Sequence, residues 1–144
     1  MEIYKKSQIL SSLSNEQKLI HQSKHLLLEL YRCDSEKLND ESFLRCILNR
    51  AAKLANAKVL NLISHKFSPQ GVTAIALLAE SHISIHTWPE SNYSAVDIFT
   101  CGKNMTPELA SQYLIESLMA KEHSLRVNER NPPSAVSNQI RTAV

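Results

Sequence analysis

Three strand-like runs follow one another between Gly71 and Gly102, and they constrain the fold more than any other part of the chain. Residues 72–79 are almost continuously apolar, which is typical of a strand buried on both faces. Residues 83–88 and 95–100 have the composition of two further strands. Gly71 and Gly102 are the only glycines in 144 residues, and glycine serves where the backbone needs a positive φ or a close approach. We therefore expect a sharp turn at each end of this segment.

A strand, a helix and another strand are expected before it. Leucines alternate in residues 25–31, and residues 58–67 are rich in valine, leucine and isoleucine, as strands are. Between them the sequence predicts a helix over 40–56, with Asp40 as its N-cap and Glu41 in the first turn. Its expected core residues, which share one side at the helical period, are Phe43, Leu44, Ile47, Leu48, Ala51 and Leu54.

A second helix and a last strand are expected after the segment. Thr106 is the predicted N-cap, Pro107 holds the first helical position and Glu108 is a first-turn acid. The apolar residues expected on this helix are Leu109, Ala110, Tyr113, Leu114, Leu118 and Met119. Residues 124–129 predict a strand that ends before two consecutive prolines.

This order of elements predicts an α+β fold, a two-layer sandwich with a mainly antiparallel sheet and two helices on one face. The four middle strands form one meander. We expect one domain over 23–131, an N-terminal extension over 1–22 and a flexible tail over 132–144. Because the helices cover one face, the other face needs a partner, and a dimer packed sheet to sheet would supply it.

Composition excludes several classes of protein. The formal charge is +2 and the basic residues are scattered among acids, unlike the basic stripe of a nucleic-acid binder. No apolar run is long enough for a membrane span, and no apolar core follows the first lysines as in a secretory signal. The three cysteines are far apart, so we expect reduced thiols in a cytoplasmic protein.

The chemistry-bearing residues gather in the middle of the chain. A turn near residues 79–82 would fold 83–88 back against 72–79 and place Ser81 at a hairpin tip. The side chains that would then share one face of the returning strand are His82, Ser84, His86 and Trp88. Taken singly, each of these residues has an ordinary structural role, as does Cys101.

A zinc site made of His82, His86 and Cys101 is rejected. Two histidines four residues apart in a strand lie about 13 Å apart along it, too far for one tetrahedral ion. We therefore expect no metal.

Together, LAESHISIHTWPE over 78–90 and AVDIFTCG over 95–102 resemble the signature of prokaryotic S-adenosylmethionine decarboxylases, which are pyruvoyl-dependent enzymes. The similarity runs from about Ser23 to Arg130. It implies decarboxylation of S-adenosylmethionine to S-adenosyl 3-(methylthio)propylamine, the aminopropyl donor for spermidine, and it implies a dimer.

The resemblance also implies self-processing. Glu80-Ser81 is similar to the cleaved bond, so that residues 1–80 become a beta chain and Ser81 becomes the pyruvoyl group that begins an 81–144 alpha chain. His86 matches the histidine that assists this maturation. Thr73 stands where relatives commonly carry a serine hydroxyl that supports processing, and its extra methyl departs from that pattern.

Three further residues match positions that act on the substrate. Cys101 matches the cysteine that donates a proton in catalysis. Phe67 matches the aromatic residue placed against adenine, and Glu90 the acid that holds the ribose hydroxyls. Two segments depart from the family pattern. The loop 91–94 lacks a glycine that is often seen there, and residues 1–22 are additional to many relatives.

Physical chemistry supports these roles. The Ser81 hydroxyl can attack the carbonyl of Glu80 and convert an amide into an ester, and an imidazole such as His86 suits the elimination that follows. The resulting ketone forms a Schiff base with the substrate amine and draws electrons from the breaking carboxylate bond. A thiol such as Cys101 can then protonate the carbanion near neutral pH. The sulfonium substrate would gain about 0.5–2 kcal/mol from the face of Phe67.

Two alternatives remain. A pyruvoyl enzyme of the same fold could act on ornithine or arginine, and only Phe67 and Glu90 favour a nucleoside. An inert binding module would never be cleaved. Carbon dioxide release from each substrate and a denaturing gel distinguish these cases.

Overall fold

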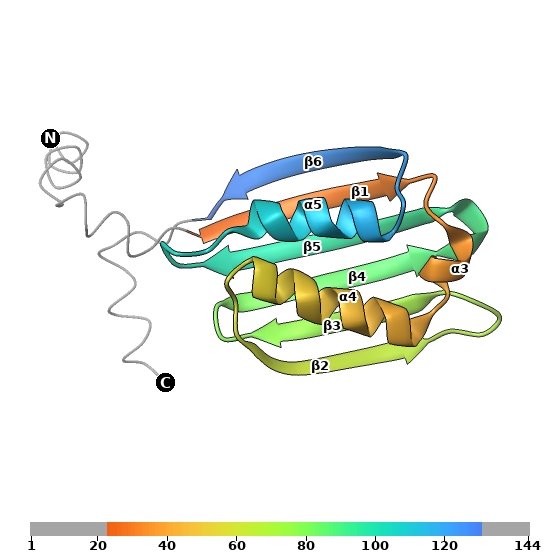
Figure 1. The fold of residues 1–144 in the computed structure, drawn as a ribbon, viewed down its shortest axis with the longest axis horizontal. Helices are drawn as coiled ribbons and strands as arrows, with labels where there is room; N and C mark the ends of the chain where they lie inside the picture. The colour runs from red at the N-terminus through yellow and green to blue at the C-terminus, as the bar shows by residue number, and fades with distance from the viewer. Residues whose placement is uncertain (1–22, 131–144) are drawn as a thin grey trace, which may run out of the picture.

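Six strands form one antiparallel sheet in residues 23–130, which are the residues that the computed structural model describes (Figure 1). The extension expected over 1–22 and the tail expected over 132–144 lie outside the described residues. The elements are β1 (Ser23–Tyr31), α3 (Ser35–Leu38), α4 (Glu41–Leu54), β2 (Val59–Lys66), β3 (Val72–Leu78), β4 (Ser81–Trp88), the 3₁₀ turn η1 (Pro89–Ser91), β5 (Tyr93–Cys101), α5 (Pro107–Ser117) and β6 (Glu122–Glu129).

The strand order is β2-β3-β4-β5-β1-β6. The four-strand meander is confirmed as β2 to β5, in which each strand pairs with the next. The first strand, β1, then lies between β5 and β6 and pairs with both. Segments from the two ends of the described chain are therefore neighbours in the sheet.

Both long helices cover the same face of the sheet, so the α+β two-layer sandwich is confirmed (Figure 1). The core lies between the layers. Its fully buried large side chains include Leu26, Leu28, Leu30, Leu44, Leu48, Ile83, Ile85, Ile98, Leu114 and Leu118. Burial of this apolar surface drives the two layers together. Among the described residues, no helix is both long enough and apolar enough to span a membrane.

Helix α4 begins as predicted, because the Asp40 carboxylate accepts a hydrogen bond from the amide of Phe43 at 3.0 Å. Most of the predicted apolar side is buried or partly buried. Leu54 is the exception, since 41% of it is exposed. In the last turn the buried positions are Ala52 and Ala55, and the carbonyl of Ala55 accepts a hydrogen bond from the loop before α5.

Helix α5 begins at Pro107, and Thr106 occupies the N-cap position. The Thr106 side chain does not cap the helix, however. Its hydroxyl donates to the carbonyl of Leu54 at 2.9 Å and so ties the start of α5 to the end of α4. Leu109 and Met119, two of the apolar residues expected on this helix, are exposed, because the buried side of α5 runs through Ala110, Ser111 and Leu114.

The prediction that β3 is buried on both faces is wrong. Val72, Ala74, Ala76 and Leu78 are buried beneath the helices, but 51% of Leu77 is exposed. The reason is that no described helix covers the opposite face. We call that surface the open face, and it carries the side chains of alternate residues from all six strands.

Candidate active site

A tight turn at residues 79–80 joins β3 to β4, so that Ser81 begins β4 at one end of the sheet, as the sequence predicted. Both residues of the turn are hydrogen-bonded to the backbone of Lys58. The amide of Ala79 donates to the Lys58 carbonyl at 2.9 Å, and the Glu80 carboxylate accepts from the Lys58 amide at 3.0 Å. Ser81 has a φ of 156°, a positive value that is uncommon outside glycine. The peptide bond between Glu80 and Ser81 is thus held at a defined place.

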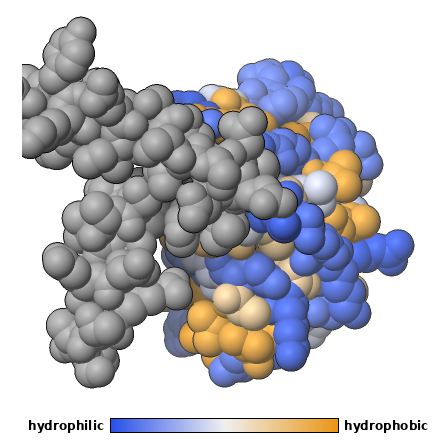
Figure 2. Space-filling model, turned by 90° about the vertical axis from the view of Figure 1, so that its left-hand side faces the viewer, coloured by the Kyte–Doolittle hydropathy of each residue, from blue (hydrophilic) through white to orange (hydrophobic). Residues whose placement is uncertain are grey.

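Cys101 lies at the same end of the sheet. His82 pairs with Phe99, and this register brings the start of β4 and the end of β5 to one edge. Cys101 is exposed, and Gly102 follows it with a φ of 126°, a conformation that favours glycine. Figure 2 views this end, where hydrophobic surface appears as separate patches among hydrophilic residues.

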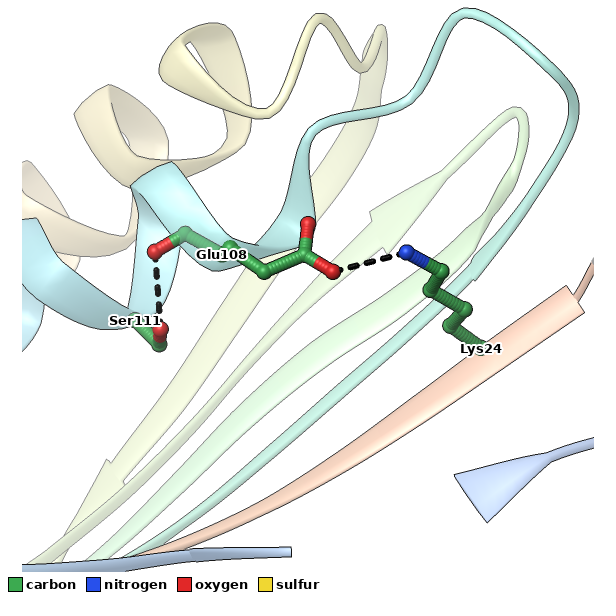
Figure 3. A network of polar contacts seen from close by, with 3 residues as sticks. All are labelled: Lys24, Glu108 and Ser111. Carbon is green, nitrogen blue, oxygen red and sulfur yellow. Dashed lines mark hydrogen bonds and ion pairs between the residues drawn. The ribbon is translucent and has the colours of Figure 1, made fainter. Parts of the chain in front are cut away.

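An ion pair near the end of β5 joins α5 to β1. Lys24, which pairs with Thr100, donates to the Glu108 carboxylate at 2.8 Å, and the Ser111 hydroxyl donates to the Glu108 carbonyl (Figure 3). Partial burial of Glu108 opposes its ionisation. The hydrogen bond and charge of Lys24 nevertheless hold the pKa of this carboxyl below its usual value.

A cluster of rings lies on the open face next to Ser81. The Ser81 hydroxyl oxygen is 3.4 Å from Nδ1 of His82, whose ring lies edge-on to those of His25 and Phe99. Nε2 of His25 is in turn 2.9 Å from the Asp97 carboxylate. The sequence placed His82 on this face but assigned it no role, and nothing local in the sequence pairs His25 with Asp97, 72 residues away.

A pocket of about 290 Å³ lies at the opposite end of β3 and β4. It brings together four predicted site residues, which are Phe67, Thr73, His86 and Glu90. Across the two strands the Thr73 hydroxyl lies 2.9 Å from Nδ1 of His86. Gly71 closes the pocket with a φ of 99°, and a Cβ there would lie only 3.0 Å from the carbonyl oxygen of Thr87.

Two aromatic side chains, Phe67 and Trp88, line this pocket, and each contacts further aromatic rings. Phe67 is 49% exposed and meets His65 edge-on, so part of its ring is open to a ligand. On the other side Trp88 packs against Tyr93, which stacks on Tyr31 at 5.5 Å. Partial burial, together with a hydrogen bond from its hydroxyl to Glu29, raises the pKa of Tyr93 to about 12.

The predicted residues therefore form two groups at opposite ends of the sheet. One group contains Glu80, Ser81 and Cys101, and the other is the pocket with His86. Ser81 and His86 are five residues apart on one strand, which corresponds to about 17 Å. A larger cavity of about 460 Å³, beside Arg32 and Lys121, contains none of the predicted residues. Within one chain the structure does not bring His86 to Ser81.

No group of three or more histidine, cysteine, aspartate or glutamate side chains in residues 23–130 is placed to hold a metal ion. His82 and His86 lie on the same strand and contact different partners, Ser81 and Thr73. The Ser81 end carries hydroxyl, imidazole, thiol and carboxylate groups, whereas the pocket with His86 carries hydroxyl, imidazole and carboxylate groups.

Comparisons with known proteins point to one family. The sequence model described as S-adenosylmethionine decarboxylase matches residues 24–131. A protein of Synechococcus sp. (strain WH7803), named S-adenosylmethionine decarboxylase proenzyme, is 59% identical over 119 residues, which cover 83% of this chain and 93% of that protein. A protein of the same name from Prochlorococcus marinus (strain MIT 9211) is 57% identical over 117 residues, covering 81% of this chain and 96% of the relative.

A solved structure agrees with this assignment. The crystal structure of the adenosylmethionine decarboxylase from Aquifex aeolicus VF5 superposes with a TM-score of 0.72 at 36% identity. The match covers 79% of this chain and 94% of that one.

Proposed function

Because the chain belongs to the S-adenosylmethionine decarboxylase family, we infer that it removes the carboxyl group of S-adenosylmethionine and so makes the aminopropyl donor for spermidine. We propose that it does so with a pyruvoyl group made from its own Ser81. The observation that carries this proposal is the position of Ser81, directly after a turn whose two residues are both hydrogen-bonded to Lys58. The name proenzyme, which its relatives bear, is consistent with self-processing.

In this proposal the bond between Glu80 and Ser81 is the one that breaks. The Ser81 hydroxyl attacks the carbonyl of Glu80 and converts the amide into an ester, and an elimination at Ser81 then releases residues 1–80 with a free carboxylate. Water hydrolyses the imine left at residue 81 to the ketone, and its nitrogen leaves as ammonia. The hydrogen bond between the Glu80 carboxylate and the Lys58 amide limits the motion of that carbonyl before attack. The same bond can hold the new chain end in place afterwards.

The pyruvoyl ketone, once formed, supplies an electron sink for the bond to the departing carboxylate. The residues around it fit this chemistry. Cys101 is exposed at the same edge as Ser81 and is free of disulfide bonds, so its thiol can donate a proton to the substrate carbon. We assign it that role.

We assign substrate binding to the pocket at the far end of β3 and β4. The open part of the Phe67 ring offers a stacking surface to adenine and an attractive face to the sulfonium cation. The exposed Glu90 carboxylate can accept hydrogen bonds from two ribose hydroxyls. The pocket lies at the small end of the range for ligand sites, so a second surface is needed to enclose the nucleoside.

We propose that a second copy of the chain supplies this surface. The two groups of site residues lie about 17 Å apart along β4, too far for His86 to act on Ser81 of the same chain. Two open faces packed by a twofold axis would bring the His86 end of one copy to the Ser81 end of the other. Exposed apolar side chains on the open face, among them Ile63, Leu77 and Trp88, favour such burial.

Intact mass of the purified protein, measured together with carbon dioxide release from S-adenosylmethionine, tests the proposal. We expect fragments that correspond to residues 1–80 and 81–144, with a ketone in place of the amine of residue 81. Release from ornithine or arginine alone would assign the other substrate class. A single full-length mass without activity would indicate an inert module.

A further inference from the structure

The imidazole that lies next to the Ser81 hydroxyl belongs to His82 rather than to His86. The distance from the hydroxyl oxygen to Nδ1 is 3.4 Å, slightly longer than an ordinary hydrogen bond. Such contacts often shorten only when the reacting groups engage. Neighbouring residues of a strand normally point to opposite faces, but Ser81 opens β4 directly after the turn with a φ of 156°.

Two rings hold the His82 ring in place. Phe99 on β5 pairs with His82 across the two strands, and their ring centroids are 5.8 Å apart with an interplanar angle of 65°. The ring centroid of His25 on β1 is 6.5 Å from that of His82, with an interplanar angle of 71°. The Arg130 guanidinium lies over the Phe99 ring, 4.9 Å from its centroid. The ring that touches the serine therefore has limited freedom to turn.

Asp97 determines which ring nitrogen of His25 carries the hydrogen in their contact. Its carboxylate can only accept, so the hydrogen on the 2.9 Å contact belongs to Nε2 of His25. His25 thus presents a fixed orientation to His82. The Asp97 carboxylate orients the His25 imidazole, which lies against His82, and His82 in turn contacts the Ser81 hydroxyl. This arrangement suits the activation of a nucleophile.

We propose that His82 is the base for the first step of maturation and that His25 and Asp97 are its positioning residues. Nδ1 of His82 accepts the hydroxyl proton while the Ser81 oxygen bonds to the carbonyl carbon of Glu80. The carbon–nitrogen bond between Glu80 and Ser81 then breaks, and the proton passes to the departing nitrogen. An ester replaces the amide, His82 ends as it began, and no co-reactant is needed.

This inference rests on the proposed function, since it concerns how the 81–144 fragment is made. It divides the work between two imidazoles. His82 serves the ester-forming step within its own chain, and His86 of a second copy serves the later loss of the α-proton. Variants of the two histidines should therefore stop maturation at different stages.

Cleavage of the freshly translated full-length chain, followed by intact mass over time, tests this division. The variants are His82→Ala, His82→Asn, which keeps a polar atom near Nδ1, and His86→Ala. His123→Gln on the exposed strand β6 is the matched control. Each sample is also treated with hydroxylamine, which cuts esters but not ordinary amides.

We expect both His82 variants to slow cleavage by about 100-fold or more and to resist hydroxylamine, because no ester forms. Imidazole added to the buffer should restore part of the rate to His82→Ala. His86→Ala should stay uncleaved until hydroxylamine splits it, and the control should match the wild type. Cleavage of His82→Asn within about twofold of the wild type would overturn the inference. So would equal splitting of His82→Ala and His86→Ala by hydroxylamine. Failure of the wild type to cleave would instead refute the proposed function.

Discussion

Thr73 and His86 face each other across β3 and β4, with the Thr73 hydroxyl 2.9 Å from Nδ1 of the imidazole. This contact orients the ring, and within residues 23–130 its Nε2 has no hydrogen-bond partner that would compete with a reacting group. We expect Thr73→Val to slow the appearance of the 81–144 fragment by about 2- to 12-fold, the value of one hydrogen bond. Thr73→Ser should stay within about twofold of the wild type because it keeps the hydroxyl. A mass time course that shows Thr73→Val at the wild-type rate would contradict this role.

Cys101 should matter for catalysis and not for cleavage. We expect Cys101→Ala to mature normally but to release carbon dioxide at least about 100-fold more slowly, because the proton donor is gone. Cys46→Ala is the control, since Cys46 is exposed on α4 away from both site groups. A denaturing gel and a carbon dioxide assay measure the two steps separately. An uncleaved Cys101→Ala chain would move this residue from catalysis to maturation.

The cysteines should also differ in their reaction with iodoacetamide. Burial raises the pKa of Cys33 to about 11, so at pH 8 its reactive thiolate is scarce as well as shielded. Cys46 is exposed. We expect peptide mapping of the native protein to show label on Cys46, with Cys33 labelled only after unfolding. Equal labelling of both in the native state would contradict the packing of Cys33.

The Lys24–Glu108 pair should contribute little to stability, and only above acid pH. The pKa of Glu108 is lowered in the folded state. The contribution of the pair is therefore present above the unfolded-state pKa of Glu108 and is lost as the pH falls through its folded-state pKa. Both side chains are partly exposed, so we expect a coupling of about 0.5 kcal/mol at pH 7.

A double-mutant cycle of Lys24→Met and Glu108→Gln, measured by urea unfolding, gives this coupling. At pH 2 the coupling should vanish, because Glu108 is then protonated. A coupling that is unchanged between the two pH values would show that it is not electrostatic.

Association through the open face can be tested at Ile63, which is 59% exposed there. A buried glutamate at this position would carry an unpaired charge into the interface, so we expect Ile63→Glu to halve the molecular mass in solution. Decarboxylation should fall with it, since the proposed site is shared between copies. Leu109→Glu on the outer side of α5 should change neither property. Light scattering that finds Ile63→Glu still paired would contradict the proposed face.

The elements that follow from local chemistry were predictable. Asp40 supplies the N-cap of α4 with its own side chain, and the turn before Ser81 follows from two apolar runs that must pair. The short helix α3 was missed, although its signal is local. The Asp34 side chain accepts from the amides of Glu36 and Lys37, in the segment between the first expected strand and the first expected helix, to which no element was assigned.

What depends on distant pairing could not be predicted. The apolar run of β3 is the same whether helices cover one face or two, so the exposure of Leu77 required the arrangement of the whole sheet. The contact between His25 and Asp97 depends on the placement of β1 beside β5. Likewise, the face that His86 shares with His82 was predictable, but the proposal that His86 acts on a second copy followed only from the two separated site groups.

The proposed cut falls between β3 and β4, yet it does not divide the molecule into two halves. The first piece holds β1, β2 and β3, and the second holds β4, β5 and β6, while β1 sits between β5 and β6. A strand of the first piece thus lies between two strands of the second. The two new ends can move apart locally, because the hydrogen bonds of β1 to β5 and β6 keep the fragments together. Once unfolded, however, the severed protein must reassemble by encounter, and its melting temperature then depends on concentration.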